Sequence, residues 1–538
     1  MGKYVIGLDY GTDSARAVLV STEDGKVIAE SVSNYSRWAQ GKYCDNSAQM
    51  FRQHPLDYYE SLKAVLHGVL DSRPEIAAQV CGIGIDCTGA TPCLVDSKLR
   101  PLALDPRYAE NPDAMFVLWK DHSSMKEAAE IEASAGEYMD STSGTYSPEF
   151  YWCKLLHVLR SSPELKKDAY QFLELCDWIP TLLCGNSDPA KCRISHSVVA
   201  VKMLYNPAKG GLPPREWFAS LDDCWLDVVD HTHPGHYTCD KAYGTLCKEF
   251  ADEFGMSTDV VVACGVIDSF AGAVGSGITP TRPIMTLGTS SGYITAVPEK
   301  DAKWVHGAFS QAEGFVMPGM FSVEMGLSAF GDAYAWLAKL LGWFPQHNGE
   351  KCSSGAILKA LGEEAQTLPL DENAPFATDF FNGRRSPDQN PNLWGSVMGL
   401  RLNTSAPEIY RALVEATCFA TRAIIERLGE HGMAPEEVMC IGGISQKSPY
   451  VMQMLADVCG IPMKVYDNKE TCALGSAMSG AAVAGAYPSI EAARDGMMAG
   501  VKETFTPDAS LKAYYDRRYL RYKAATAFTQ ECSASAAE

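Results

Sequence analysis

A short turn, Gly-Thr-x-Ser, occurs in both halves of the 538-residue chain, each time between two apolar segments that are typical of strands. The first copy is Gly11-Thr-Asp-Ser14 and the second is Gly288-Thr-Ser-Ser291. One copy would carry little weight, because glycine and hydroxyl residues are common in turns. Two copies, each at the head of a segment as long as a domain, indicate a duplicated fold.

Strand-like and helical patterns alternate after each copy of the turn. Asp24-Gly25 separates two strand-like segments and predicts a hairpin, so the chain should open with an antiparallel meander. Further strands are expected at 81–86, 260–264, 283–287, 293–297 and 438–441, and helices at 55–73 and, after a capping Ser448, at 449–459. Strands that alternate with helices indicate an α/β architecture.

The length of the chain exceeds what a single hydrophobic core supports, so two large domains are expected. The small residues Gly275-Ser-Gly277 are suited to a hinge between them. The predicted domains are residues 1–277 and 278–538.

Composition narrows the class of protein. A net charge of −20 argues against a broad nucleic-acid surface, which needs clustered lysine and arginine. The 18 cysteines contain no CxxC pair, which excludes a zinc knuckle or a thioredoxin motif. The chain opens on a strand-like segment rather than a signal peptide. We therefore expect a reduced, cytoplasmic protein without a nucleic-acid partner.

The longest charge-free stretch, residues 471–490, is the one candidate for a membrane span. It consists mainly of alanine, glycine and serine, and Pro488 interrupts it. This composition is typical of a close-packed buried helix rather than a lipid-facing one, so no membrane association is expected.

The Gly-Thr-x-Ser turns predict phosphate binding by a route other than a P-loop, because the sequence contains no GxxxxGK[ST] motif. Glycine lets the backbone approach a phosphate, and the threonine or serine hydroxyl adds a donor to the N–H groups. Asp9, at the end of a strand beside the first turn, is a candidate for holding Mg²⁺ through water. The alternative is an ordinary hairpin with a capping aspartate.

Longer motifs around these turns resemble those of a known superfamily. Asp9-Tyr-Gly-Thr-Asp-Ser14 and Gly288-Thr-Ser-Ser291 resemble the two phosphate motifs of the sugar kinase, actin and heat-shock ATPase fold, and Gly442-Gly-Ile-Ser-Gln-Lys-Ser-Pro449 resembles its adenosine motif. Gly395-Ser-Val-Met-Gly-Leu400, followed by Glu408-Ile-Tyr-Arg-Ala-Leu-Val-Glu415, resembles the second signature of the FGGY family of carbohydrate kinases. One departure is His157, where the first signature usually has tryptophan three residues after its lysine, here Lys154.

The resemblance implies two actin-like (ribonuclease H-like) ATPase domains with an interdomain cleft, an N-terminal sugar-binding domain and a C-terminal nucleotide-binding domain. It implies ATP and Mg²⁺, with Asp9 and Asp268 at the metal. Asp268, in Gly265-Val-Ile-Asp-Ser-Phe-Ala-Gly272, matches the base that accepts the proton of the sugar hydroxyl. Its alternative role is to cap a helix. The residues expected to face the nucleotide are Thr12, Asp13, Gly288, Thr289, Gly442 and Gly443.

The substrate-side residues resemble those of family members that phosphorylate ribulose. Ala90, Lys202, Asp268 and Glu324 are expected to contact the sugar. Without the resemblance, Lys202 would be read as a solvated lysine and Glu324 as a surface acid. The implied reaction is ATP-dependent conversion of L-ribulose to L-ribulose 5-phosphate, a step of L-arabinose catabolism.

Three alternatives stay open. The kinase would act on another pentulose or polyol, such as D-ribulose, D-xylulose or ribitol, or the chain would be an inactive sugar sensor. Gly288-Thr-Ser-Ser-Gly292 also satisfies GxSxG, the nucleophile elbow of serine esterases, but that motif requires a helix after the serine and the pattern here predicts a strand. A small-molecule sugar and ATP are the expected partners, and a homodimer is an open alternative to a monomer.

Overall fold

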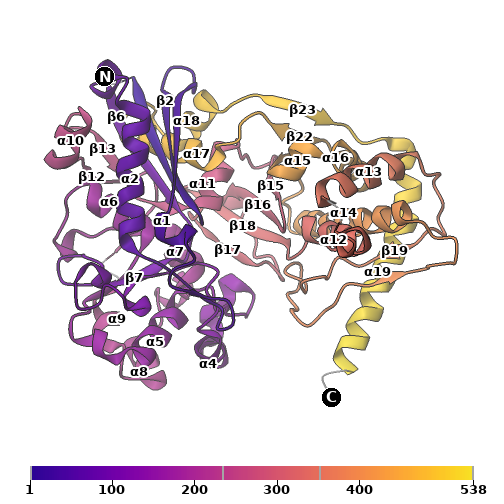
Figure 1. Ribbon diagram of the computed structural model, residues 1–538, viewed down its shortest axis with the longest axis horizontal. Helices are drawn as coiled ribbons and strands as arrows, with labels where there is room; N and C mark the ends of the chain where they lie inside the picture. The colour runs from indigo at the N-terminus through magenta and orange to yellow at the C-terminus, as the bar shows by residue number, and fades with distance from the viewer. Residues whose placement is uncertain (1–2, 233–234, 350–352, 536–538) are drawn as a thin grey trace. The chain divides into compact units, whose positions relative to one another are not determined.

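The computed structural model describes residues 3–232, 235–349 and 353–535 (Figure 1). The chain divides into two compact units. The first contains the chain up to Gly277 together with Ala312–Ser322 and Glu470–Ala499, and the second contains Ile278–Gln311, Val323–Lys469 and the residues after Ala499. The structure thus departs from the expected division in the two later segments, which belong to the first unit.

The main sheet of the first unit has the strand order β12-β13-β6-β1-β2-β3, with β14 paired to β6. Its strands are β1 (Tyr4–Tyr10), β2 (Ser14–Ser21), β3 (Val27–Asn34), β6 (Val80–Cys87), β12 (Ala242–Thr245), β13 (Val261–Ala263) and β14 (Val266–Ile267). Strands β1, β2 and β3 form the expected antiparallel meander, and β6 lies parallel to β1 on its other side. Smaller pairings involve β4 (Cys44–Asp45), β5 (Met50–Gln53), β7 (Pro92–Val95), β8 (Phe116–Val117), β9 (Gln171–Glu174), β10 (Ile194–Ser195) and β11 (His236–Tyr237).

Two helices cover opposite faces of this sheet. Side chains alternate along a strand, so Gly7 and Asp9 of β1 face one side and Tyr10 faces the other. Tyr10 packs edge-on against Tyr58 of α2 (Pro55–Leu70), with ring centres 6.0 Å apart. Gly7 faces α17 (Thr471–Val483), and Figure 1 shows this late, yellow helix beside the indigo strands of the N-terminus. Residues 471–483 of the charge-free stretch therefore form a buried helix, as the composition predicted.

Glycines allow α17 to approach the sheet to backbone contact. A Cβ atom on Gly7 would lie 1.8 Å from the carbonyl oxygen of Ala473, and one on Gly84 of β6 would lie 1.7 Å from that of Ser476. The same closeness joins α17 to α11 (Asp268–Gly275), where a Cβ on Gly475 would lie 1.9 Å from the carbonyl oxygen of Ala271. No larger residue fits at these positions without backbone movement.

The other helices of the first unit lie around the sheet and the smaller strand pairs. They are α1 (Ser36–Ala39), α3 (Pro74–Ala77), α4 (Met125–Ala135), α5 (Tyr151–Ser161), α6 (Leu175–Leu183), α7 (His196–Lys202), α8 (Arg215–Leu221), α9 (Leu226–Thr232), α10 (Lys248–Phe254) and α18 (Ile490–Met497).

The other large sheet, which belongs mainly to the second unit, repeats the topology of the first. Its order is β17-β18-β16-β15-β21-β22-β23, formed by β15 (Ile284–Leu287), β16 (Ser291–Pro298), β17 (Ser310–Glu313), β18 (Met320–Leu327), β21 (Val438–Ile441), β22 (Met463–Tyr466) and β23 (Val501–Phe505). Strand β15 is antiparallel to β16 and parallel to β21, as β1 is to β2 and β6. The duplication indicated by the two turns is therefore present in the strand order.

Helices and one short strand pair, β19 (Phe376–Ala377) with β20 (Val397–Met398), complete the second unit. The helices are α12 (Gly331–His347), α13 (Ser354–Thr367), α14 (Ala406–Glu430), α15 (Gly443–Lys447), α16 (Pro449–Cys459) and α19 (Lys512–Ser535). Helix α16 begins after Ser448 as expected, although the serine side chain makes no capping hydrogen bond, and it ends at Gly460 in the left-handed conformation. The second turn leads from β15 into β16, which excludes the strand–serine–helix arrangement of an esterase elbow.

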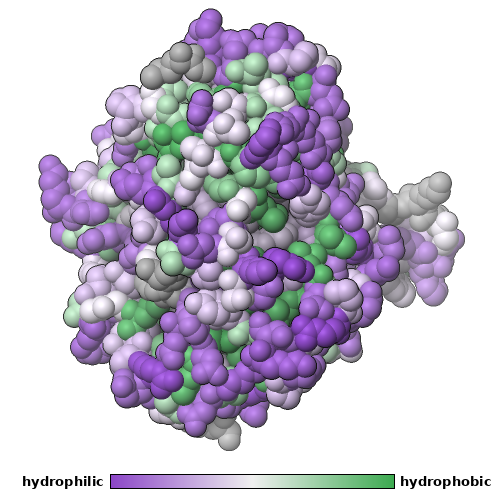
Figure 2. All heavy atoms as spheres, turned by 90° about the vertical axis from the view of Figure 1, so that its left-hand side faces the viewer, coloured by the Kyte–Doolittle hydropathy of each residue, from purple (hydrophilic) through white to green (hydrophobic). Residues whose placement is uncertain are grey.

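None of the helices in the described ranges combines the length and the apolar composition that a membrane span requires. Figure 2 shows one face of the molecule, on which hydrophilic residues predominate and hydrophobic residues are scattered among them. This distribution is ordinary for a protein surface exposed to water.

The glycine contacts of α17 generate a stability prediction. Gly475→Ala should destabilise the protein by about 1–3 kcal/mol or more, because the new methyl group overlaps the backbone of α11. The measurement is the midpoint of thermal unfolding. Gly429→Ala in α14 is the matched control, since its Cβ would meet only the Ala434 side chain at an ordinary 3.8 Å. Equal midpoints for the two variants would contradict the proposed tightness of the α11–α17 contact.

Candidate functional site

Asp9 lies at the end of β1 with an ionisable neighbour on each adjacent strand. The pairing register places Arg16 of β2 opposite it on one side and Asp86 of β6 on the other. The Arg16 guanidinium donates to Asp9 Oδ2 at 3.1 Å and lies 3.6 Å from Glu470. Two carboxylates and one guanidinium therefore meet at the edge where β1 and β6 end.

Asp86 is fully buried beneath α17. The Ser476 hydroxyl donates to Asp86 Oδ2 at 2.5 Å, and Oδ1 has no hydrogen-bond donor among the described residues. Burial raises the pKa of Asp86 well above its usual range, and the nearby Asp9 carboxylate adds to the increase. An orphaned carboxylate oxygen next to a second carboxylate is an arrangement that a cation would stabilise.

The donor atoms at this point suit a hard divalent cation. Carboxylate oxygens of Asp9 and Asp86 and the sulfur of Cys472 lie within 4.8 Å of one another. Burial raises the pKa of the Cys472 thiol well above its usual range, and sulfur is a soft ligand that a hard cation binds poorly. Oxygen ligands remain, and these are the ligands that Mg²⁺ prefers.

The first Gly-Thr-x-Ser turn is closed by a hydrogen bond from Gly11 N to the Ser14 carbonyl, at 3.0 Å. Two indoles hold its side chains: Trp119 Nε1 donates to Thr12 Oγ1 at 3.0 Å, and Trp38 Nε1 donates to Asp13 Oδ1 at 2.6 Å. The Asp13 carboxylate and the Gly11 N–H group are thus already engaged.

Asp268 is the first residue of α11 and is half-buried. Its Oδ1 accepts a hydrogen bond from Ser269 N at 2.6 Å, and its charge contributes to the raised pKa of Asp86. Asp268 directly follows β14, whose Val266 pairs with Asp86 of β6, so it lies near the Asp9–Asp86 pair, at the positive end of a helix that α17 holds in place.

The loop between β6 and β7 contains Ala90, and Lys202 ends α7. Lys202 is 7% exposed, and its Nζ lies 4.6 Å from the centre of the Phe150 ring. Burial of this kind is unlike a solvated surface lysine. Ala90 is also buried, so both residues belong to the interior of the first unit.

Glu324 lies on β18 and belongs to the second unit. It is half-buried, and the Ser310 hydroxyl donates to its Oε2 at 2.7 Å. A partly buried acid with an ordered partner differs from the free surface acid that an isolated sequence position would suggest.

A cavity of about 670 Å³ lies in the second unit beside the second turn. Its wall includes Gly288 and Gly443, and the aromatic rings of Tyr410 and Tyr450, which stack with centres 6.1 Å apart, also contribute. This volume is typical of pockets for small ligands and cofactors. A nucleoside would fit a cavity with an aromatic wall and a glycine-lined edge.

Two adjacent glycines at this edge have different constraints. Gly442 has φ +93°, and a Cβ there would lie 2.6 Å from the Leu287 carbonyl oxygen, whereas a Cβ on Gly443 would have no atom of the described residues within 4 Å. The second turn itself is fixed by α12, because Gly331 N donates to the Gly288 carbonyl at 3.0 Å and Phe330 N to the Thr289 carbonyl at 2.8 Å.

Comparison with known proteins identifies the family. Models of the N-terminal and C-terminal domains of the FGGY family of carbohydrate kinases match residues 4–275 and 284–484. The chain belongs to this family. It is therefore an ATP-dependent sugar kinase with the two-domain fold of that family.

Relatives match the kinase over almost its whole length. A protein named ribulokinase from Vibrio parahaemolyticus is 37% identical over 97% of this chain and 95% of its own, and one from Shouchella clausii is 33% identical over 97% and 94%. Among solved structures, xylulose kinase from Rhodospirillum rubrum superposes with a TM-score of 0.80 at 22% identity, covering 98% of this chain and 99% of its own. The structural similarity supports the fold.

Sequence reasoning did not identify Asp86 as a site residue, although it placed a strand at 81–86. The missed signal was an aspartate ending an apolar strand, the same pattern that drew attention to Asp9. Ligands gather at the carboxyl ends of parallel strands, and β1 and β6 are parallel neighbours. That pairing is a tertiary fact, so the sequence alone did not bring the two acids together.

The two glycines at the cavity give a paired prediction. Gly443→Ala should fold normally but raise the KM for ATP about tenfold or more, because the methyl group enters the cavity. Gly442→Ala should instead lower the free energy of unfolding by about 1–3 kcal/mol, because its backbone is left-handed and its Cβ would overlap Leu287. Thermal unfolding and ATP-dependent kinetics separate the effects. Normal ATP kinetics in Gly443→Ala would show that the nucleotide binds elsewhere.

Proposed function

We propose that this kinase transfers the γ-phosphoryl group of ATP to L-ribulose, giving L-ribulose 5-phosphate and ADP. One geometric observation carries the chemistry: Asp268 begins α11 directly after β14, whose Val266 pairs with Asp86 of β6, so a proton acceptor lies beside a cation-type site. The choice of acceptor is supported by full-length similarity to proteins named ribulokinase.

In the proposed reaction, Asp268 accepts the proton of the 5-hydroxyl group as that oxygen attacks the γ-phosphorus. The new bond joins the sugar oxygen to phosphorus, and the bond from the γ-phosphorus to the β–γ bridging oxygen breaks. ADP leaves with the bond's electron pair. The half-buried position of Asp268 lets it reach a ligand while it stays partly shielded from water.

The cation of the proposal is Mg²⁺, held by Asp9 and Asp268, with Asp86 next to Asp9. When bound, it would neutralise negative charge on the phosphate groups. Arg16, which pairs with Asp9 and is partly exposed, orients that carboxylate.

The nucleotide would contact Thr12, Asp13, Gly288, Thr289, Gly442 and Gly443. Because the Asp13 side chain accepts from Trp38, we assign Asp13 a backbone contact. Gly443 lines the cavity, and no atom of the described residues occupies the space where its side chain would be, which supports a close approach of the nucleotide to this residue.

The cysteines of the described residues are free thiols, which is consistent with the cytoplasm as the proposed location.

The sugar would contact Ala90, Lys202 and Glu324. Lys202 and Glu324 offer a donor and an acceptor for sugar oxygens. The Ala90 carbonyl already accepts from Lys154, so the contact from this residue would come from its N–H side. Stereoisomeric pentuloses and the related polyol present similar sets of hydroxyl groups to such contacts, so D-ribulose, D-xylulose and ribitol are the competing acceptors.

A coupled ADP-release assay over these acceptors tests the proposed reaction. L-ribulose should give the highest kcat/KM, and omission of Mg²⁺ should abolish turnover. Rapid phosphorylation of D-xylulose or glycerol without activity on either ribulose enantiomer would refute the choice of sugar. A protein that binds sugar but releases no ADP would be a sensor instead of an enzyme.

The role of Asp268 has its own test. Asp268→Asn should lower kcat by about 10²–10⁴-fold, because the amide cannot accept the proton, while sugar affinity changes less because the amide oxygen still accepts a hydrogen bond. Asp252→Asn is the control, since Asp252 is exposed and pairs with Lys248 on α10. A normal kcat in Asp268→Asn would leave this residue only a structural role at the start of α11.

A further inference from the structure

A buried lysine on α5 has no part in the reaction described above. Lys154 is 1% exposed, and its Nζ donates to the carbonyl oxygens of Ala90 at 2.6 Å, Leu118 at 2.9 Å and Trp119 at 3.4 Å. An ammonium group has three N–H bonds, and here each has a backbone carbonyl to donate to. Burial of an ammonium is costly, and methionine would fill a similar volume without that cost. The ammonium charge must therefore have a role that an apolar side chain of the same volume could not perform.

The three carbonyls belong to two loops that lead to different parts of the site. Ala90 lies in the loop proposed to contact the sugar. Leu118 and Trp119 follow β8, and the Trp119 indole donates to Thr12 in the first phosphate turn. The Lys154 ammonium group therefore connects the Ala90 loop with the segment Leu118–Trp119, which contacts the first Gly-Thr-x-Ser turn.

An acid fixes the same loop one residue further along. Glu174, at the end of β9, accepts from Thr91 N at 2.8 Å, so the loop is held by a cation at Ala90 and by an anion at Thr91. Burial lowers the pKa of Lys154 to about 8 and raises the pKa of Glu174 to about 7. The lysine pKa falls less than burial alone would lower it, because nearby acidic groups favour the ammonium form; these are Asp121, Cys153, Glu174 and Glu149.

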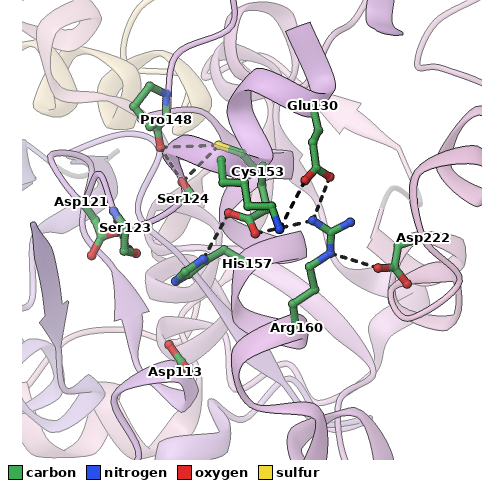
Figure 3. Close-up of polar contacts among 12 residues, drawn as sticks. Asp113, Asp121, Ser123, Ser124, Glu130, Pro148, Cys153, His157, Arg160 and Asp222 are labelled. Atoms are coloured by element: carbon green, nitrogen blue, oxygen red, sulfur yellow. Dashed lines mark hydrogen bonds and ion pairs between the residues drawn. The ribbon is translucent and has the colours of Figure 1, made fainter. Parts of the chain in front are cut away.

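Helix α5 is itself clamped, which fixes the position of Lys154. Arg160 donates to Glu130 at 2.8 Å and to Asp222 at 3.0 Å, and Figure 3 shows it between these two acids. His157, the residue that departs from the family signature, has its Nδ1 3.2 Å from Oε2 of Glu127 on α4. The lysine therefore extends from a helix that ion pairs hold in place.

We propose that Lys154 is a positioning residue that holds the Ala90 loop in its sugar-binding conformation. This inference rests on the proposed sugar phosphorylation. The lysine touches neither substrate; it acts through the three carbonyl groups.

The test compares Lys154→Met and Lys154→Arg with the wild type at several pH values. Loss of the charged hydrogen bonds in Lys154→Met should raise the KM for the sugar about 10- to 100-fold, with little change in the KM for ATP. Lys154→Arg keeps the charge and should recover part of the affinity. Lys126→Met, which removes an exposed charge from α4, should behave as the wild type.

The pH dependence of sugar affinity gives an independent test. The ammonium form is present below the lysine pKa of about 8, so wild-type sugar affinity should fall as the pH rises through this value. The arginine variant should lack that fall, because its guanidinium stays charged. If Lys154→Met does not fold, the difference in pH dependence between the wild type and Lys154→Arg still tests the role of the ammonium charge.

Two results would overturn the inference: an unchanged sugar KM in folded Lys154→Met, or the same alkaline loss of affinity in the wild type and Lys154→Arg. An equal rise in both KM values together with a lower unfolding midpoint would mean a general structural role. A wild-type protein that phosphorylates none of the sugars would instead refute the proposed function, which this design detects before any variant is measured.

Discussion

Backbone contact between α17 and the first sheet is the constraint on which the rest of the first unit depends. The carbonyls of Ala473 and Ser476 occupy the space that side chains at Gly7 and Gly84 would fill, and α11 approaches the same helix through Gly475. Glycine loses more conformational freedom on folding than other residues, so such contacts carry an entropic cost. The burial of a helix that is apolar on nearly all sides offsets this cost.

That contact also determines the electrostatics of the site. Gly84 and Asp86 face the same side of β6, so the helix that fits over the glycine also covers the carboxylate. Without water around it, Asp86 retains its proton more strongly, and Asp9 in the neighbouring register position has the same effect. Asp268 is brought near them because α11 packs on the same helix. Lys154 and Glu174 represent a second use of buried charge in the unit, since both bind backbone atoms of one loop.

Local patterns were enough to predict much of the architecture. Asp24-Gly25 correctly indicated the hairpin between β2 and β3, and the small-residue stretch after residue 470 correctly indicated a buried helix. The helix at 55–73 was found with its end three residues early, at Leu70. The paired turns indicated a duplication that the strand orders of the two sheets bear out. These features depend on residues close together in the sequence, so residue spacing and turn-forming residues are enough to predict them.

The sequence by itself determined the turns, most strands, the buried character of α17 and, through its motifs, the kinase family. Only the tertiary structure decided that 470–499 belongs to the first unit, that Asp86 lies beside Asp9, and that Lys154 binds the Ala90 loop. The physical reason is separation along the chain. Ser476 meets Asp86 across 390 residues, and such a contact depends on strand register and on close packing between backbones, which no local periodicity encodes.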